Sequence, residues 1–238
     1  MTNLKEQIQN LAFFVTFLSV FSPSYALTKT ILTNCNIIDG TGRPAARDMV
    51  ITISENKIST IEKGPYKSIG ETDREIIDLK GGYVLPGFWN NHSHLSDLLP
   101  DVNDILGKEN TVSATIRAGR NAMDAIKRGF TSLRSTGSRD YLDVYWGKAF
   151  KDGVFIGPTI YPAGNPIAAV GGHGIDDYAW PATIAINGPK EMRKAVREHV
   201  RMGVNWIKIM ADELKDNEII AAVQIAHPNN VKVVAHAA

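Results

Sequence analysis

The feature that most constrains this chain is a change of pattern at Pro86. Beyond it, short apolar runs alternate with longer segments of helical periodicity. That alternation is typical of strand–helix units that build a parallel sheet. One helical segment, residues 190–202, repeats apolar positions at spacings of three and four, so one of its faces should be buried. We therefore predict an α/β architecture for residues 86–238.

Five strands are expected in this part, at residues 83–88, 129–133, 159–163, 206–210 and 232–236, with helices at about 109–128, 140–152, 190–202 and 215–227. A closed barrel of eight strand–helix units needs ~250 residues. The chain provides about five of the eight strands. We predict a partial TIM-type (β/α) barrel, and three explanations for it stay open: a fragment of a longer protein, a truncated gene, or strands supplied by a second chain.

Residues 27–85 have a different pattern of short β-branched runs. Turn residues separate them at Asp39-Gly40, Glu55-Asn56 and Gly81-Gly82. This pattern predicts antiparallel strands in a small β-sandwich domain. Cys35 is the only cysteine, so no internal disulfide can form, and its place in a predicted strand favours a buried thiol.

Residues 1–26 have the three-part pattern of a secretory signal peptide. Lys5 precedes an apolar run from Leu11 to Phe21, and the small residues Ser24 and Ala26 suit the −3 and −1 positions of signal peptidase. The run is well short of the roughly 20 residues that span a bilayer. We predict cleavage after Ala26 and a secreted or periplasmic protein with no membrane segment after cleavage. An uncleaved amphipathic or anchoring helix is the alternative.

The charge balance excludes some classes of partner. The chain has 26 basic and 25 acidic side chains. Near-neutrality gives no electrostatic basis for binding nucleic acid or an anionic membrane. The expected partner is a small molecule, and an oligomer is compatible with the sequence.

His92 and His94 are the first candidate site residues. They follow the predicted strand entry Leu85-Pro86-Gly87. In extended chain, residues two apart point to the same side, so both imidazoles can bind one cation. Active sites of such barrels lie at the carboxyl ends of the strands. The alternative is a pair of hydrogen-bonded structural histidines.

Together with Ile38-Asp-Gly-Thr-Gly42, these motifs resemble the amidohydrolase superfamily, in particular its Xaa-Pro and Xaa-Arg dipeptidase and imidazolonepropionase-like branches. The resemblance covers residues 30–238. It implies that His92 and His94 bind one metal ion, that a carboxylated Lys208 bridges two ions, and that His236 binds the second. Imidazole and carboxylate ligands favour zinc, with manganese, iron and cobalt as alternatives.

The residues around Lys208 and His236 bear on these roles. Lys208 lies between Ile207 and Ile209, where a buried ammonium without a partner is costly. A neutral amine can add CO₂ to form a carbamate with two oxygen ligands. A lysine at a sheet edge or in a salt bridge, and a structural histidine at position 236, are the alternatives.

Two further residues are candidates for contact with substrate. His173, in Val170-Gly-Gly-His-Gly174, resembles a loop of the dipeptidase-like branch that reaches over the substrate, so it is a candidate catalytic and substrate-binding residue. A glycine turn that happens to contain histidine is the alternative. Arg134 ends the second strand, where it could bind a substrate carboxylate or join an ion pair. His199 and His227 are expected on helices, away from the site.

The resemblance implies hydrolysis of a carbon–nitrogen bond in a dipeptide or cyclic amide by a metal-activated hydroxide. The histidine of the sixth strand and the acid–base aspartate of the eighth have no counterpart in this chain. Loss of such an aspartate costs on the order of 10²- to 10⁴-fold in rate. A catalytically inactive truncated remnant and a periplasmic metal-binding protein are therefore the competing functions.

Overall fold

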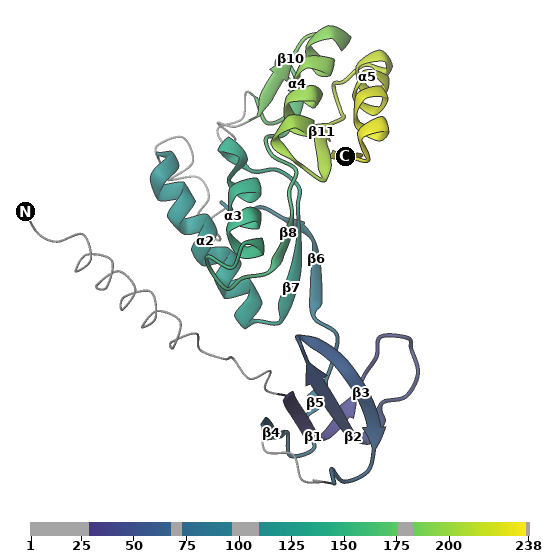
Figure 1. Cartoon of the computed structure of the whole chain (residues 1–238). Helices are drawn as coiled ribbons and strands as arrows, with labels where there is room; N and C mark the ends of the chain where they lie inside the picture. Colours follow the sequence, from purple (N-terminus) through teal and green to yellow (C-terminus); the bar gives the residue numbers. More distant parts are fainter. Residues whose placement is uncertain (1–28, 68–72, 97–109, 176–182, 237–238) are drawn as a thin grey trace, which may run out of the picture. The chain divides into compact units, whose positions relative to one another are not determined.

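The computed structural model describes residues 29–67, 73–96, 110–175 and 183–236. The predicted signal peptide and its cleavage site after Ala26 lie outside the described residues. The chain divides into two compact units, Met1–Pro86 and Gly87–Ala238, which are described separately below (Figure 1). Within the described residues, no helix combines the length and the apolar character needed to span a membrane.

The described residues of the N-terminal unit form one mixed five-stranded sheet. Its strands are β1 (Lys29–Ile37), β2 (Ala46–Ser54), β3 (Lys57–Lys63), β4 (Arg74–Asp78) and β5 (Tyr83–Val84). The order is β3-β2-β1-β4, and β5 also pairs with β1. β1–β2 and β2–β3 are antiparallel, but β4 and β5 run parallel to β1. The prediction of wholly antiparallel strands is therefore wrong, because turn residues report only on tight hairpins.

The tight hairpin itself is where the sequence placed it. Glu55 and Asn56 join β2 to β3 with φ values of 52° and 59°. Two successive left-handed residues are the geometry of a type I′ turn, whose twist matches that of the flanking strands. A second sheet packed on this one, as a β-sandwich requires, is not seen among residues 29–67 and 73–86.

Cys35 lies in the core of this unit, as predicted. Its side chain is fully buried, and Sγ donates to the Met49 carbonyl oxygen at 3.2 Å. Burial raises the pKa of the thiol. Ile31, Val50 and Ile51 are the other buried apolar residues of this sheet. A small, partly covered core of this kind is typical of a sheet with one solvated face.

The C-terminal unit alternates parallel strands with helices. The strands are β6 (Phe88–Ser93), β7 (Phe130–Ser135), β8 (Thr159–Tyr161), β9 (Ile167–Ala169), β10 (Ile184–Ile186), β11 (Trp206–Met210) and β12 (Lys232–His236). The helices are α2 (Thr111–Lys127), α3 (Leu142–Lys151), α4 (Pro189–Met202) and α5 (Asp216–Ala226). All pairings in this unit are parallel. The chain thus has the mixed α/β fold that the sequence predicts.

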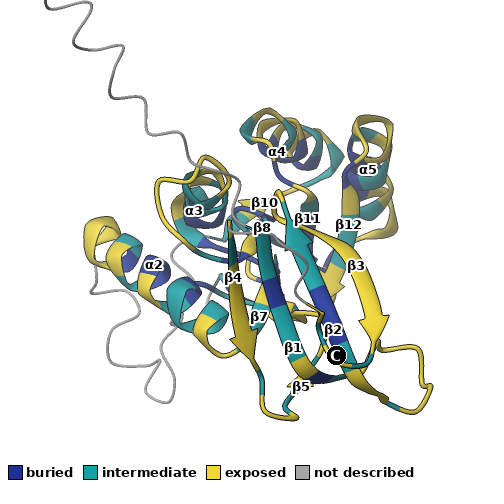
Figure 2. Ribbon diagram, turned by 60° about the horizontal axis from the view of Figure 1, so that its bottom comes forward, coloured by how far each residue is buried: buried dark blue, intermediate teal, exposed yellow. Residues whose placement is uncertain are grey.

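The helices bury one face each against the strands. In Figure 1, α2 and α3 lie on the same side of the β6–β8 sheet, and Figure 2 shows their buried residues on the faces toward the strands. On α4, Met192, Ala195, Val196 and His199 are buried, which confirms the predicted face. Helix boundaries follow local signals: the Asn110 side chain caps α2 by accepting from the Ser113 N–H at 2.9 Å, and Gly203 ends α4 at φ 84°.

Two strand predictions need correction. The run predicted as one strand at residues 83–88 is split: Tyr83–Val84 belongs to the N-terminal sheet, and the first strand of the second unit is Phe88–Ser93. His92 therefore lies within a strand, and His94 follows it. The short strands β9 and β10 were missed, because three-residue strands lack a detectable period.

The third strand of this unit is interrupted. β8 pairs with β7, whereas β9 pairs with β11 through Ile167 and Ile209. The intervening residues 162–166 lie outside any strand. They bring Gly164 and Pro166 against the segment that follows β7, where Ser138 N–H donates to the Gly164 carbonyl oxygen at 2.8 Å.

Candidate metal centre

His92 and His94 face each other at the end of β6. Their Nε2 atoms are 3.3 Å apart, and the rings meet edge to face. Two nitrogens bonded tetrahedrally to one zinc ion at about 2.0–2.1 Å are separated by about 3.3–3.4 Å. The pair thus has the spacing of two ligands of one ion, although a hydrogen bond between the two rings has the same spacing.

The surroundings of His94 fix which ring nitrogen can bind a cation. Nδ1 lies 3.1 Å from the Gly137 carbonyl oxygen, which can only accept, so Nδ1 carries the proton. Nε2 then presents its lone pair toward His92 and toward the Thr136 hydroxyl at 3.3 Å. Metal-binding histidines commonly have their second nitrogen fixed in this way. Burial lowers the pKa of His94 to about 4, which favours the neutral form that ligates metals.

Lys208 lies in the middle of β11 and is 2% exposed. Within the described parts of the chain, no hydrogen bond or ion pair to its amine is found. Burial lowers the pKa of Lys208, and the charge of Arg134 adds to this, whereas Asp212 acts in the opposite sense. A lowered pKa increases the neutral fraction of the amine, which is the form that the prediction for Lys208 requires.

The structure brings the four predicted ligands into one region. The pKa of His92 is lowered by burial and then by the charges of Lys208, Arg134 and His236, so these groups lie within electrostatic range of it. Lys208 and His236 also lower the pKa of His94. β11 and β12 are neighbours, and Met210 pairs with His236 at their carboxyl ends.

His173 stacks on His236. Their ring centroids are 4.8 Å apart with an interplanar angle of 15°. The His173 side chain is exposed, but its backbone N–H donates to Oε2 of Glu213 at 3.2 Å. A Cβ on Gly172 would lie 2.9 Å from the same oxygen, so glycine is needed for this close approach. Glu213 thus holds the glycine-rich loop over the end of β12.

The Arg134 side chain is already engaged. Its Nε donates to the Asn91 carbonyl oxygen at 2.6 Å, and its guanidinium lies 5.2 Å from the centre of the Trp206 ring. These contacts tie three strands together and add a cation–π interaction. They hold the guanidinium near His92 and Lys208.

The donor set suits a divalent ion but is incomplete by itself. In the part of the chain that the structure describes, no group of three or more His, Cys, Asp or Glu side chains is arranged to hold a metal ion. Two imidazoles with matching spacing and a buried lysine amine are present. The set fits the predicted centre if Lys208 becomes an oxygen ligand, since carbamate oxygens suit the same cations as carboxylates.

The other two histidines considered in the sequence lie elsewhere. His199 is buried in α4, where Nδ1 lies 2.9 Å from the Ala195 carbonyl oxygen and Nε2 lies 2.7 Å from that of Asn165. His227 is exposed at the start of a 3₁₀ turn, His227–Asn229. Neither takes part in the metal centre.

Sequence reasoning missed three groups around the site: Gly137, Asp143 and Glu213. Each acts across a separation of 20 or more residues, as with the 43 residues between His94 and Gly137. Gly137 follows β7 and has φ 138°. The only sign of its role in the sequence is a glycine shortly after the end of a predicted strand.

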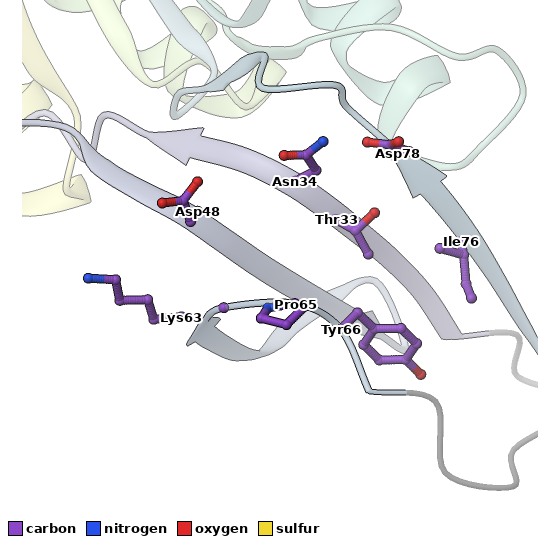
Figure 3. Close-up of a pocket in the computed structure, with 9 residues that line it drawn as sticks. Thr33, Asn34, Asp48, Lys63, Pro65, Tyr66, Ile76 and Asp78 are labelled. Atoms are coloured by element: carbon purple, nitrogen blue, oxygen red, sulfur yellow. The ribbon is translucent and has the colours of Figure 1, made fainter.

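The N-terminal unit contains a separate cavity of about 700 Å³ (Figure 3). Its lining comes from strands β1 to β4 and the segment after β3, and consists of Thr33, Asn34, Asp48, Lys63, Gly64, Pro65, Tyr66, Ile76 and Asp78. None of the predicted site residues lines it.

The fold and the site together define a class: an α/β protein with paired imidazoles and a buried lysine on parallel strands. The chain belongs to the amidohydrolase family, whose model matches residues 83–238. The resemblance inferred from the sequence motifs is therefore confirmed.

Individual relatives are hydrolases by name. An ochratoxinase of Aspergillus niger is 28% identical over 204 residues, which is 74% of this chain and 40% of that protein. The solved structure of a Xaa-Pro dipeptidase has a TM-score of 0.77 and 29% identity, covering 88% of this chain and 57% of the other. The A. niger ochratoxinase structure, at 23% identity and a TM-score of 0.71, shows the same fold. The chain spans about half the length of these relatives or less.

Proposed function

We propose that this protein is the N-terminal part of a metal-dependent hydrolase that cleaves carbon–nitrogen bonds, with a dipeptide or cyclic amide as substrate. One observation carries the proposal: the Nε2 atoms of His92 and His94 are 3.3 Å apart beside the buried Lys208. Family membership and the Xaa-Pro dipeptidase among the similar structures support the reaction class and the dipeptide substrate. In this reading residues 87–238 are part of a (β/α) barrel, and the N-terminal sheet is half of a β-sandwich.

Each residue has a definite task in the proposal. His92 and His94 would hold one cation, and His236 would help to hold a second. Lys208 would supply oxygen ligands to both as a carbamate, formed when its neutral amine adds CO₂ and releases a proton. A divalent cation, with zinc as the first choice, supplies polarisation of the amide carbonyl and acidification of a water molecule. His173 and Arg134 orient the substrate, whose carboxylate suits a guanidinium.

Export through the predicted signal peptide belongs to the same proposal. Zinc suits an exported enzyme without disulfides, because metal binding adds free energy to the folded state. Cys35 is the only cysteine in this sequence, so a metal centre would supply a cross-link that no disulfide within residues 1–238 can supply.

A second candidate function is metal binding without turnover. It needs only the His92–His94 pair, whose Nε2 atoms are 3.3 Å apart, and no acid–base group. Turnover would need a general acid for the leaving amine as well, a contribution of about 10²–10⁴-fold.

Metal binding is the first experiment. The purified protein is titrated with Zn²⁺, Mn²⁺ and Co²⁺, and His92→Ala and His94→Ala are compared with His227→Ala, which removes an exposed histidine. We expect both site variants to lose far more affinity than the roughly 10- to 100-fold typical of an outer-shell change, and His227→Ala to match the wild type. Unchanged affinity in both site variants would refute the site.

Turnover and carbamate formation are tested separately. Hydrolysis of Xaa-Pro and Xaa-Arg dipeptides and of cyclic amides distinguishes the hydrolase from the metal-binding protein. Labelling with ¹³CO₂ should give a carbamate NMR signal that is absent in Lys208→Arg. A metal-loaded protein without turnover on any of these substrates favours the second candidate.

A further inference from the structure

Residues 163–166, which join β8 to β9, rest on a buried carboxylate. Asp143 is fully buried in α3, and its Oδ2 accepts hydrogen bonds from the N–H groups of Ala163 at 2.8 Å and Gly164 at 3.0 Å. Its Oδ1 accepts from the N–H of Val144 at 2.9 Å. Burial raises the pKa of the carboxyl, and these hydrogen bonds oppose that shift. Oδ2 of this enclosed carboxylate therefore holds residues 163–166, and the same carboxyl group also interacts with the Ser135 side chain at the end of β7.

A second clamp holds the same loop. His199 Nε2 lies 2.7 Å from the Asn165 carbonyl oxygen, and the Tyr141 ring packs so closely that a Cβ on Gly164 would lie 2.7 Å from it. Tyr141 and the preceding Asp140 both have left-handed φ values, 54° and 51°. Such a conformation costs of order 1–3 kcal/mol for each residue and persists only where surrounding contacts determine it.

The loop in turn holds the segment that fixes His94. The Gly164 carbonyl oxygen accepts from the Ser138 N–H at 2.8 Å. The peptide group that contains this N–H also contains the Gly137 carbonyl, which accepts from His94 Nδ1 at 3.1 Å. A Cβ on Gly137 would lie 2.6 Å from Cγ of Pro166, so the two segments are in direct contact.

We propose that Asp143 is a positioning residue for the metal ligand His94, acting through residues 163–166 and the peptide group between Gly137 and Ser138. This inference rests on the proposed metal centre. Hydrogen-bond partners that orient a ligand typically change metal affinity by 10- to 100-fold when removed. Asp143 lies two hydrogen-bonded links behind that partner and is fully buried, so its effect should fall on ligand geometry.

The test compares Asp143→Asn with Val231→Ala. The first keeps the shape of the side chain but replaces one acceptor oxygen by an NH₂ group. The second opens a cavity in the core between α5 and β11, where Val231 is buried with Ile207 and Ala226, and controls for a general loss of stability. Both proteins are measured for Zn²⁺ affinity, thermal midpoint and, without metal, the ¹⁵N NMR signals of the His94 ring.

We expect Asp143→Asn to weaken Zn²⁺ binding about 10-fold or more and to convert the single Nδ1–H form of His94 into a mixture of tautomers. Val231→Ala should lower the thermal midpoint while leaving affinity within about twofold and the tautomer unchanged. Wild-type affinity and tautomer in Asp143→Asn, or equal losses in both variants, would overturn the proposal. If the wild type binds no metal, the proposed function fails, but the tautomer measurement still tests the positioning role.

If Asp143→Asn does not fold, the second clamp supplies the test. His199→Gln weakens the hold on Asn165 while Asp143 remains in place. A shift of the His94 tautomers in that variant supports the inference. An Nε2–H form of His94 in the wild-type protein, which would contradict the hydrogen bond to Gly137, overturns it with no variant at all.

Discussion

The reactivity of Cys35 depends on how deeply its thiol is buried. Its thiol is fully buried in β1, and burial raises its pKa. We expect it to react with a disulfide reagent at neutral pH at least ~100-fold more slowly than a thiol in unfolded chain, because only the exposed thiolate reacts. The measurement compares the reaction rate in buffer with the rate in roughly 6 M guanidinium, which unfolds the chain. Equal rates in the two solvents would show that the N-terminal sheet opens freely.

The site residues divide into those that the sequence could predict and those that it could not. His92 and His94 are neighbours in sequence, and Lys208 and His236 lie in predicted strands with apolar neighbours. Gly137, Asp143 and Glu213 carry no such signal, because their roles are hydrogen bonds to backbone groups far away along the chain. Backbone partners of this kind depend on tertiary structure alone.

At the scale of elements, helix α2 depends on a glycine. A Cβ at Gly119 would lie 2.0 Å from Cζ2 of Trp146, and the Trp146 ring is held by a hydrogen bond from Nε1 to the Thr115 carbonyl oxygen at 3.0 Å. Helix propensity favours Gly119→Ala by about 1 kcal/mol. We expect overpacking to outweigh it and to destabilise the protein by about 1–3 kcal/mol in urea unfolding.

Gly147 in α3 is the matched control. A Cβ there would lie 3.4 Å from Cβ of Ile160, which is ordinary contact. Gly147→Ala should therefore leave the free energy of unfolding unchanged or raise it by up to ~1 kcal/mol. A stabilising Gly119→Ala, or equal effects at both positions, would show that α2 and α3 separate more easily than their packing indicates.

The elements of the second unit were predicted well for a physical reason. Its helices are long enough to show their period, and β11 and β12 are short, mainly apolar runs that each follow a helical segment. The errors fall where the signal is local or weak. β9 and β10 have three residues each. The split between β5 and β6 falls at Leu85-Pro86-Gly87, and the prediction of one strand over residues 83–88 ran across this Pro-Gly pair. Strand direction in the first unit depends on long connections, about which composition says nothing.

At the scale of the whole molecule, the two units carry separate spectroscopic probes. All four tryptophans, Trp89, Trp146, Trp180 and Trp206, follow residue 87, and the single cysteine precedes it. Tryptophan fluorescence therefore follows the unfolding of the second unit, and the reactivity of Cys35 follows that of the first.

Zn²⁺ should stabilise the second unit selectively. Binding to the native state adds about 2.7 kcal/mol when the free ion is at 100 times its Kd. We expect the thermal midpoint seen by fluorescence to rise with Zn²⁺, to fall back with a chelator, and not to respond in His92→Ala. The thermal midpoint of the first unit, followed by the reactivity of Cys35, should change by less than about 2 °C when the chelator is added. A rise that persists in His92→Ala would point to a different binding site.

The hydrogen bond between His94 and Gly137 has a consequence for how relatives of this chain are recognised. A search for the two-histidine motif examines three consecutive residues, but the ring that matters is oriented by a peptide group 43 residues away. A homologue that keeps both histidines and has a bulky residue in place of Gly137 would retain the motif and lose the ligand geometry. Assigning metal dependence across such a group of sequences should therefore require the glycine and the aspartate of α3 as well as the histidines.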